Sequence, residues 1–256
     1  MLEVYGYDFS GYTHASLHRR VNRLISMDNF LSFAEFRYRV RQDPQYGRRF
    51  VEQVTVNVTE MFRDPAFYQV LREQVFPQIA VKPFIRIWHA GCSTGEEVYS
   101  MAILLQEANL LHKTIIYATD INTEVLERGR DGIFPLAHMR QYSENYMAAG
   151  GRNDFSSYYT AGYDRAIFQE YLKKKIVWST HNLVSDSSFN EFQLILCRNV
   201  LIYFDKDLQQ RVLSLFDASL EDLGFLALGS KETIRFSGLH SRFRQVERQK
   251  IWKKTG

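Results

Sequence analysis

A turn of small residues, Gly91-Cys92-Ser93-Thr94-Gly95, is the first place where this sequence could hold a ligand. A β-branched and aromatic run at 84–88 precedes the turn, and apolar residues at helical spacing follow it over 98–105. Glycines let the backbone approach a ligand closely, and the free N–H groups of a first helical turn favour polar or anionic groups. This order is typical of a nucleotide-like cofactor site. The turn lacks the full G-x-G-x-x-G spacing, so a tight βα turn of any α/β protein explains it equally well.

An acidic residue, Asp120, ends the next apolar run, at 115–118. A carboxylate at the end of a second strand, after a glycine turn, is placed to accept hydrogen bonds from ribose hydroxyls. Asp120 could instead cap the helix that the pattern predicts over 123–130. Because Asn122 and Thr123 are both available for capping, we favour the ligand role for Asp120.

Two further apolar runs, at 176–178 and 192–197, also lead into polar residues, Asn182 and Asn199. In open α/β sheets the ligand crevice lies outside the carboxyl ends of the strands, so these amides should lie near the glycine turn and the acidic residue. An amide offers both a donor and an acceptor, which suits adenine or a carboxylate. We therefore predict one cofactor pocket at this edge of the sheet.

The elements that must position these residues differ along the chain. Up to residue 75 the pattern predicts helices only, with a capping box at Ser32 and Glu35, a stop at Asp43-Pro44, and an N-cap with N1 proline at Asp64-Pro65. Further on, 132–175 is irregular, and a helix near 208–216, a strand at 225–228 and a hairpin over 243–252 follow. The predicted domains are a helical domain with a linker helix at 1–75, and an α/β domain at 76–256 with a β subdomain inserted at about 150–175.

Composition and charge exclude several classes of protein. The chain has 256 residues and a net charge of +3, and neither an apolar leader nor a membrane-length segment occurs, which predicts a cytoplasmic protein. Cys92 and Cys197 have no partners at metal-ligand spacing, which predicts buried free thiols and no metal site. The first 56 residues hold eight arginines but also six acidic residues, which allows a basic helix face but argues against nucleic-acid binding.

With these elements in place, the sequence resembles the CheR-type chemotaxis receptor O-methyltransferases. These enzymes transfer a methyl group from S-adenosylmethionine to glutamate side chains of bacterial chemoreceptors. The resemblance runs from about 9 to 252 and rests on six segments in order: 17–21, 57–63, 90–100, 119–122, 182–183 and 197–204. It implies a class I S-adenosylmethionine-dependent methyltransferase fold, Rossmann-like with a mixed sheet, a small N-terminal all-helical domain and an inserted β subdomain.

The resemblance also implies roles for particular residues. With the glycine turn, the cofactor contacts would be Asn57, Thr59, Arg63, Gly91, Glu97, Asp120, Asn182, Leu183, Asn199 and Val200. Arg63 and Tyr203 would orient the substrate carboxylate, and Glu97 could meet the ammonium group of the cofactor. Simpler alternatives stay open: Asn199 as a loop cap, Glu97 as a first-turn charge on the helix dipole, and Arg63 as a partner of Asp64 or of the sheet edge.

The chemistry of such an enzyme needs little from the protein beyond placement. A glutamate side chain has a reference pKa of about 4.3 and is already ionised near neutral pH, so no general base is required. We accordingly interpret His89 and His181 as ordinary residues at strand ends. The catalytic terms would be in-line placement and exclusion of water.

The resemblance assigns the N-terminal helices to the substrate side. A basic face with Arg19, Arg20 and Arg23 would meet the acidic coiled coil of a receptor, although a solvated helix face explains it too. In some members the β subdomain binds a tether peptide of the receptor, and the sequence does not decide this point. Departures from the family pattern occur at Val98, at Met61 and at Gly229-Ser230-Lys231-Glu232.

Alternatives to the favoured function are a methyltransferase on another signalling protein or a small molecule, and a non-catalytic adenosylmethionine-binding regulator. The basic helix speaks against a small-molecule enzyme, and the presence of Arg63 and Tyr203 speaks against a regulator. A nicotinamide-dependent Rossmann enzyme ranks below these, because the glycine spacing is wrong.

Overall fold

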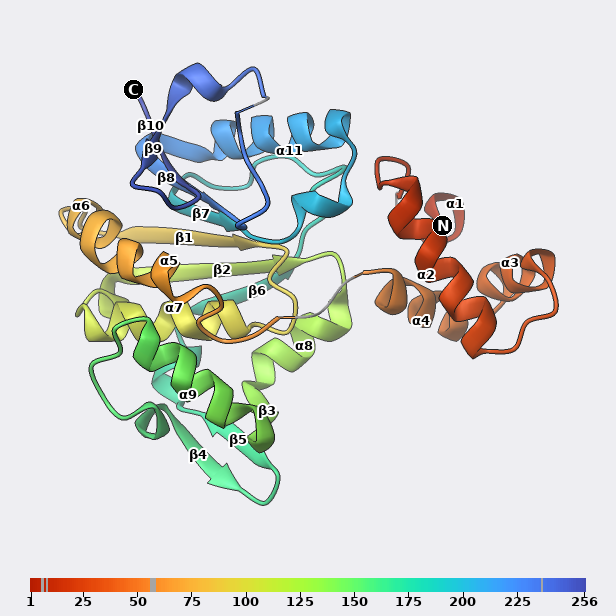
Figure 1. The fold of residues 1–256 in the computed structure, drawn as a ribbon, viewed down its shortest axis with the longest axis horizontal. Coiled ribbons are helices and arrows are strands. Elements are labelled where there is room, and N and C mark those ends of the chain that lie inside the picture. Colours follow the sequence, from red (N-terminus) through yellow and green to blue (C-terminus); the bar gives the residue numbers. More distant parts are fainter. Residues whose placement is uncertain (6, 8, 56–58, 236) are drawn as a thin grey trace.

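The structure is a computed structural model that describes residues 1–5, 7, 9–55, 59–235 and 237–256. The predicted cofactor residue Asn57 lies outside this part of the chain. Figure 1 shows a group of N-terminal helices beside a larger domain that is built on a twisted sheet.

The central sheet, within the described residues, has the strand order β6-β2-β1-β7-β8-β10-β9. Its strands are β1 (Ile85–Ala90), β2 (Thr114–Asp120), β6 (Ile176–Thr180), β7 (Phe192–Cys197), β8 (Leu220–Leu228), β9 (Phe243–Val246) and β10 (Ile251–Lys254). The strands from β6 to β8 pair in parallel, and β10 and β9 add an antiparallel hairpin at one edge. The sequence prediction of a mixed sheet with an edge hairpin is confirmed.

Helices cover both faces of this sheet (Figure 1). Along β1, Ile87 faces the core that includes α7 (Glu96–Glu107), and Trp88 faces the core that includes α11 (Lys206–Ser219). Successive side chains of a strand point to opposite faces, so a strand that is apolar at both positions must be covered twice. This arrangement brings the carboxyl ends of β6, β2, β1 and β7 to one edge, where the predicted pocket residues follow them.

The N-terminal helices have a small core of their own. They are α1 (Leu2–Tyr5), α2 (His14–Met27), α3 (Phe33–Gln42) and α4 (Pro44–Val54). The core contains Leu24, Phe36 and Val51, from three of these helices. The predicted capping signals form: the Ser32 hydroxyl accepts from the Glu35 N–H at 3.2 Å, and Asp43 ends α3 and caps α4.

The segment that follows packs against the sheet. It contains α5 (Pro65–Val70), a π-helical stretch (Leu71–Val75) and α6 (Phe76–Ile79), and its apolar residues join the core that includes α7. The sequence pattern places this segment with the N-terminal domain up to residue 75. The packing instead groups it with the sheet, because its apolar face is buried there.

A second, smaller sheet with the order β3-β5-β4 lies beside the main one. Its strands are β3 (Ile133–Pro135), β4 (Tyr159–Gly162) and β5 (Arg165–Phe168), and its neighbours are α8 (Thr123–Asp131), α9 (Met139–Ala148) and α10 (Glu170–Lys173). β4 and β5 fall within the predicted insertion at about 150–175, but β3 precedes it. A strand of three residues is too short for its alternation to be seen in the sequence. Short 3₁₀ helices occupy Leu111–Lys113, Leu136–His138, Phe155–Tyr158, Leu201–Tyr203 and His240–Arg242.

Candidate active site

The glycine turn joins β1 to α7 and needs glycine at its first position. Gly91 has a φ of +74°, and a Cβ there would lie 2.6 Å from Cγ2 of Val200. The N–H groups of Gly91 and Cys92 both donate to the carbonyl of Thr119, at 2.8 and 2.9 Å. The turn is therefore folded back onto the end of β2 and packed against the loop after β7.

Asp120 faces this turn from the end of β2. Its carboxylate accepts from the backbone N–H groups of Ser93 at 2.9 Å and Asn122 at 3.0 Å. The side chain of Asn122 caps α8 by accepting from the Glu124 N–H, which removes the alternative that Asp120 is the cap. Burial raises the pKa of Asp120, and the backbone N–H groups offset this only in part. A donor from a ligand would therefore be favourable at this carboxylate.

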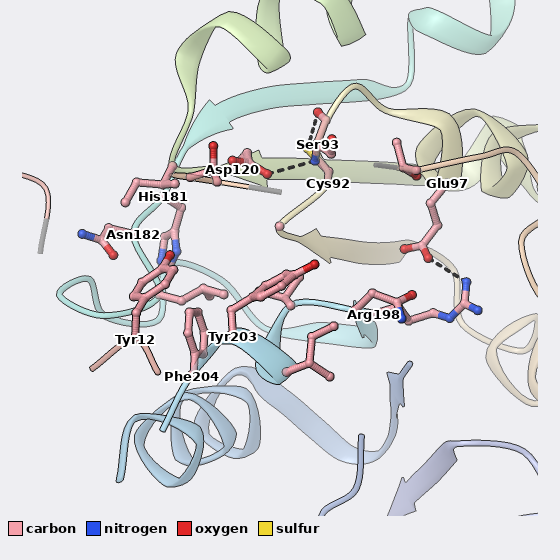
Figure 2. A pocket seen from close by; sticks show the side chains of 18 of the residues that line it. Tyr12, Cys92, Ser93, Glu97, Asp120, His181, Asn182, Arg198, Tyr203 and Phe204 are labelled. Carbon is pink, nitrogen blue, oxygen red and sulfur yellow. Dashed lines mark hydrogen bonds and ion pairs between the residues drawn. The ribbon is translucent and has the colours of Figure 1, made fainter. Parts of the chain in front are cut away.

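A cavity of about 180 Å³ opens at this edge of the sheet. Each predicted site residue within the described part of the chain lines it: Thr59, Arg63, Gly91, Glu97, Asp120, Asn182, Leu183, Asn199, Val200 and Tyr203. In the view of Figure 2, Asn182 and His181 lie toward one end of the pocket and Glu97 and Arg198 toward the other. Among the described residues, no group of three or more potential metal ligands occurs.

Glu97 is held by two cationic or potentially cationic groups. One carboxylate oxygen lies 2.9 Å from Nδ1 of His89, and the other accepts from Nη1 of Arg198 at 2.9 Å. Burial raises the pKa of Glu97, but the interactions with His89 and Arg198 outweigh it and hold the pKa below its usual value. Glu97 thus has specific partners beyond the helix dipole that the sequence offered as a simpler explanation.

Arg198 is a buried residue that sequence reasoning passed over. Besides Glu97, it pairs with the carboxylate of Asp64 at 2.6 Å and donates to the carbonyl of Arg63 at 3.2 Å. Its guanidinium also lies 4.1 Å from the ring centre of Phe67. Arg198 belongs to the segment 197–200 that carries the family resemblance. From the sequence alone, however, a charged residue just after a buried strand is expected to be exposed to solvent.

Asp64 and Pro65 stand at the N-cap and N1 positions of α5, as predicted. Arg198 accounts for two further details of this segment. Asp64 makes no capping hydrogen bond to α5, because its carboxylate is taken by Arg198. For the same reason Arg63 does not pair with Asp64, and among the described residues its side chain forms no ion pair. Phe62 and Asp64, on either side of Arg63, both have positive φ, of 54° and 60°. Backbone strain of this kind is concentrated at functional sites, and Arg63, between these two residues, lines the cavity.

The loop after β7 is held by Glu232, another residue that the prediction did not use. Its carboxylate accepts from the N–H groups of Asn199 at 3.0 Å, Ile202 at 3.2 Å and Gly229 at 2.6 Å. Asn199 itself has a φ of 62°. In the sequence, the segment 229–232 stands out only as a departure from the family pattern. In the structure, Glu232 holds the turn that carries Asn199 and Val200.

Tyr203 lies beside the N-terminal domain. The guanidinium of Arg20 sits 5.1 Å from the centre of the Tyr203 ring and donates to the carbonyl of Val54 at 2.7 Å. Arg20 is therefore turned toward the pocket, and only Arg19 and Arg23 of the predicted basic face are exposed. The two cysteines, as predicted, are buried free thiols.

Comparison with known protein families shows to which family the chain belongs. Residues 57–252 match the family described as CheR methyltransferase, SAM binding domain, and residues 1–55 match the CheR methyltransferase, all-alpha domain. The chain belongs to the CheR methyltransferase family. The CheR domain binds S-adenosylmethionine, so the predicted cofactor and the class I methyltransferase fold are both confirmed.

The relatives of this CheR chain include proteins of similar length. A Pseudomonas putida protein with the provisional name methyltransferase Cher3 is 48% identical, and the match covers 98% of this chain and 92% of that protein. A chemotaxis protein methyltransferase of Listeria innocua is 31% identical over 90% of this chain and 85% of its own. Chemotaxis protein methyltransferase 1 of Vibrio cholerae is 36% identical, and the match covers 77% of this chain and 71% of that protein. Among solved structures, the N-methyltransferase NodS from Bradyrhizobium japonicum, in complex with S-adenosylhomocysteine, is 13% identical and has a TM-score of 0.37. The match covers 84% of this chain and 71% of that protein, and the likeness is too low to inform function.

Proposed function

We propose that this CheR-family chain transfers a methyl group from S-adenosylmethionine to glutamate side chains of a bacterial chemoreceptor, leaving glutamate methyl esters and S-adenosylhomocysteine. The names of the relatives support the pathway, since two of them are chemotaxis protein methyltransferases. The observation that carries the proposal is the guanidinium of Arg63, which has no ion-pair partner among the described residues and belongs to a residue that lines the same cavity as Tyr203 and the strand ends. A guanidinium at the cavity wall suits an anionic methyl acceptor such as a carboxylate.

The cofactor would lie along the strand ends. Asp120 and Asn182 suit the adenosine hydroxyls and base, and Glu97, at the other end of the pocket, suits the ammonium of the methionine part. Gly91 and Val200 would wall the middle, where the close packing of the two leaves no room for a larger residue at 91. These roles agree with the chemistry of the donors and acceptors that the cavity presents.

The reaction needs placement more than proton transfer. When bound, S-adenosylmethionine supplies an electrophilic methyl group on a sulfonium. The glutamate oxygen forms the new O–C bond as the C–S bond breaks and its electron pair remains on sulfur, so no proton moves. Arg63 would orient the carboxylate, with Tyr203 beside it, while the cavity walls exclude water that would otherwise solvate the nucleophile.

The N-terminal domain belongs to the substrate side of this proposal. Arg19 and Arg23 of α2 are exposed and could meet the acidic coiled coil of a receptor. A receptor substrate of this kind also implies a cytoplasmic enzyme. No helix of the described residues is long and apolar enough to span a membrane.

The proposal is tested by the chemical stability of the product. Purified chain, a cytoplasmic receptor fragment and methyl-labelled S-adenosylmethionine should yield a labelled receptor that releases methanol in alkali, since esters hydrolyse there and methylated amines do not. Arg63→Ala should lower the rate at least about 100-fold while the protein stays folded. Arg140→Ala, at a side chain that is 91% exposed, is the matched control and should not change the rate.

Other outcomes would point to the alternatives. An alkali-stable label would contradict glutamate methylation and favour a different acceptor. A non-catalytic regulator would be favoured if wild type and Arg63→Ala bound the cofactor with the same affinity and no receptor fragment became labelled.

A further inference from the structure

Tyr12 comes from the N-terminal domain but lines the cavity of the other domain. It lies just before α2, and it shares the cavity wall with Asp120, Asn182 and Gly91. No motif in the sequence pointed to it. Its presence means that the N-terminal domain closes part of the pocket that the strand ends open.

The backbone around Tyr12 is fixed to the methyltransferase domain. The Thr13 N–H donates to the carbonyl of Tyr203 at 2.9 Å, and the Asp205 N–H donates to the carbonyl of Gly11 at 2.9 Å. Tyr12 and Phe204 form an antiparallel bridge between these two bonds. Gly11 is needed here because a Cβ would lie 2.7 Å from Cδ2 of Leu208. The position of Tyr12 is therefore set by main-chain hydrogen bonds across the domain boundary.

The ring of Tyr12 is held in turn by two aromatic side chains. Its centroid lies 5.0 Å from that of Phe204 and 5.1 Å from that of Phe9, both at edge-to-face angles. Edge-to-face pairs of this kind restrict how a ring can turn. A fixed ring fixes the direction of its hydroxyl.

The hydroxyl of Tyr12 has no hydrogen-bond partner among the described residues. Burial raises the pKa of the phenol, and the negative charge of the Asp120 carboxylate adds to the rise. In Figure 2, Tyr12 lies at the end of the pocket with His181 and Asn182, away from Glu97 and Arg198. A held and unpaired donor at the nucleoside end of the pocket is placed for a ligand.

We propose that Tyr12 is a cofactor-binding residue whose hydroxyl forms a hydrogen bond with the adenosine part of S-adenosylmethionine, beside Asp120. This inference rests on the cofactor placement proposed above and not on the identity of the methyl acceptor. Its consequence is that the N-terminal domain completes the cofactor site as well as facing the substrate. By linkage, cofactor binding then strengthens the contact between the domains.

The test is calorimetric titration of the whole chain with S-adenosylhomocysteine and with 5′-methylthioadenosine, which lacks the amino-acid end. Tyr12→Phe keeps the ring and its packing and removes only the hydroxyl. It should lower the affinity for both ligands by a similar factor of about three to ten. Tyr12→Ala should weaken both further. Tyr38→Phe, at an N-terminal tyrosine that is 68% exposed, is the matched control and should bind both ligands like wild type.

Each contrary result has a definite meaning. Unchanged binding of both ligands by Tyr12→Phe would overturn the inference, and so would a loss for S-adenosylhomocysteine alone, because the contact would then lie at the other end. If Tyr12→Ala does not fold, the result for Tyr12→Phe still decides. Wild-type binding with an unaffected Tyr12→Phe leaves the proposed function intact, whereas an alkali-stable product would remove the proposed acceptor and leave this inference standing.

Discussion

The two ends of the pocket hold their carboxylates in different ways. Glu97 has a side-chain partner on each oxygen, His89 and Arg198, whereas Asp120 accepts from the backbone N–H groups of Ser93 and Asn122. The pKa of Glu97 is accordingly lowered, and that of Asp120 is raised by burial. The carboxylate of Glu97 is paired before any ligand binds, whereas the carboxylate of Asp120 is stabilised most by a ligand that donates hydrogen bonds to it. The predictions below break or sharpen this contrast.

Removing the cation of the paired end should have the largest effect on stability. Arg198→Met leaves Glu97 and Asp64 without their buried partner, and breaking a buried ion pair on one side costs about 3–5 kcal/mol. Urea unfolding at pH 7 measures this loss. Arg39→Met, which removes an exposed pair with Asp43, is the control and should change stability by about 0.5 kcal/mol or less. A loss below about 1 kcal/mol in Arg198→Met would show that the network is not a stabilising unit.

Glu96, next to Glu97 in the sequence, shows how a buried carboxyl behaves when no ion pair with a described residue offsets its burial. Glu96 is buried, accepts from the Thr94 hydroxyl at 2.6 Å, and burial raises its pKa to about 7. Since the folded state holds this proton more tightly than the unfolded state, stability is lost as pH rises from about 4.5 to 7. Glu96→Gln should therefore be more stable than wild type by about 1–3 kcal/mol at pH 8 and equal to it near pH 4.5. Thermal unfolding at both pH values checks this, and equal stability at pH 8 would contradict the raised pKa of Glu96.

A smaller effect is expected where the paired end meets the turn that carries Arg63. Asp64→Asn removes the charge that pairs with Arg198 but tolerates the left-handed backbone, as asparagine does. Asp64 is about half exposed, so the stability loss should be only about 1 kcal/mol. Because the ion pair that holds Asp64, the neighbour of Arg63, is lost, the position of Arg63 becomes less fixed, and kcat of methyl transfer should fall about tenfold with little change in the KM for the cofactor. A changed KM with an unchanged kcat would place the effect of Asp64 on binding and not on Arg63.

The contrast also explains how much could be predicted from the sequence. Strand order along the chain, the glycine turn and the capping roles of Ser32 and Asn122 depend on neighbours within a few residues, and the structure confirms them. Arg198 reaches Asp64 across 134 positions and Glu232 reaches Asn199 across 33, and no local pattern encodes such partners.

Tyr12 was missed for the same reason. Its role depends on backbone bonds to the loop at Tyr203 and Asp205, which only the folded chain brings together. The pocket residues that the sequence did predict follow strand ends, where a general rule of α/β sheets applies. The groups that hold those residues in place came from elsewhere in the chain.

The most direct test of the adenosyl pocket is calorimetric titration with S-adenosylhomocysteine of wild type, Asp120→Ala and the exposed control Asp131→Ala, each shown to be folded by thermal unfolding. Wild type and Asp131→Ala should bind alike, and Asp120→Ala should lose at least about 100-fold in affinity, because the ligand loses the buried carboxylate that would accept its donors. Equal affinity of Asp120→Ala and wild type would contradict the assignment of the strand ends as the adenosine site.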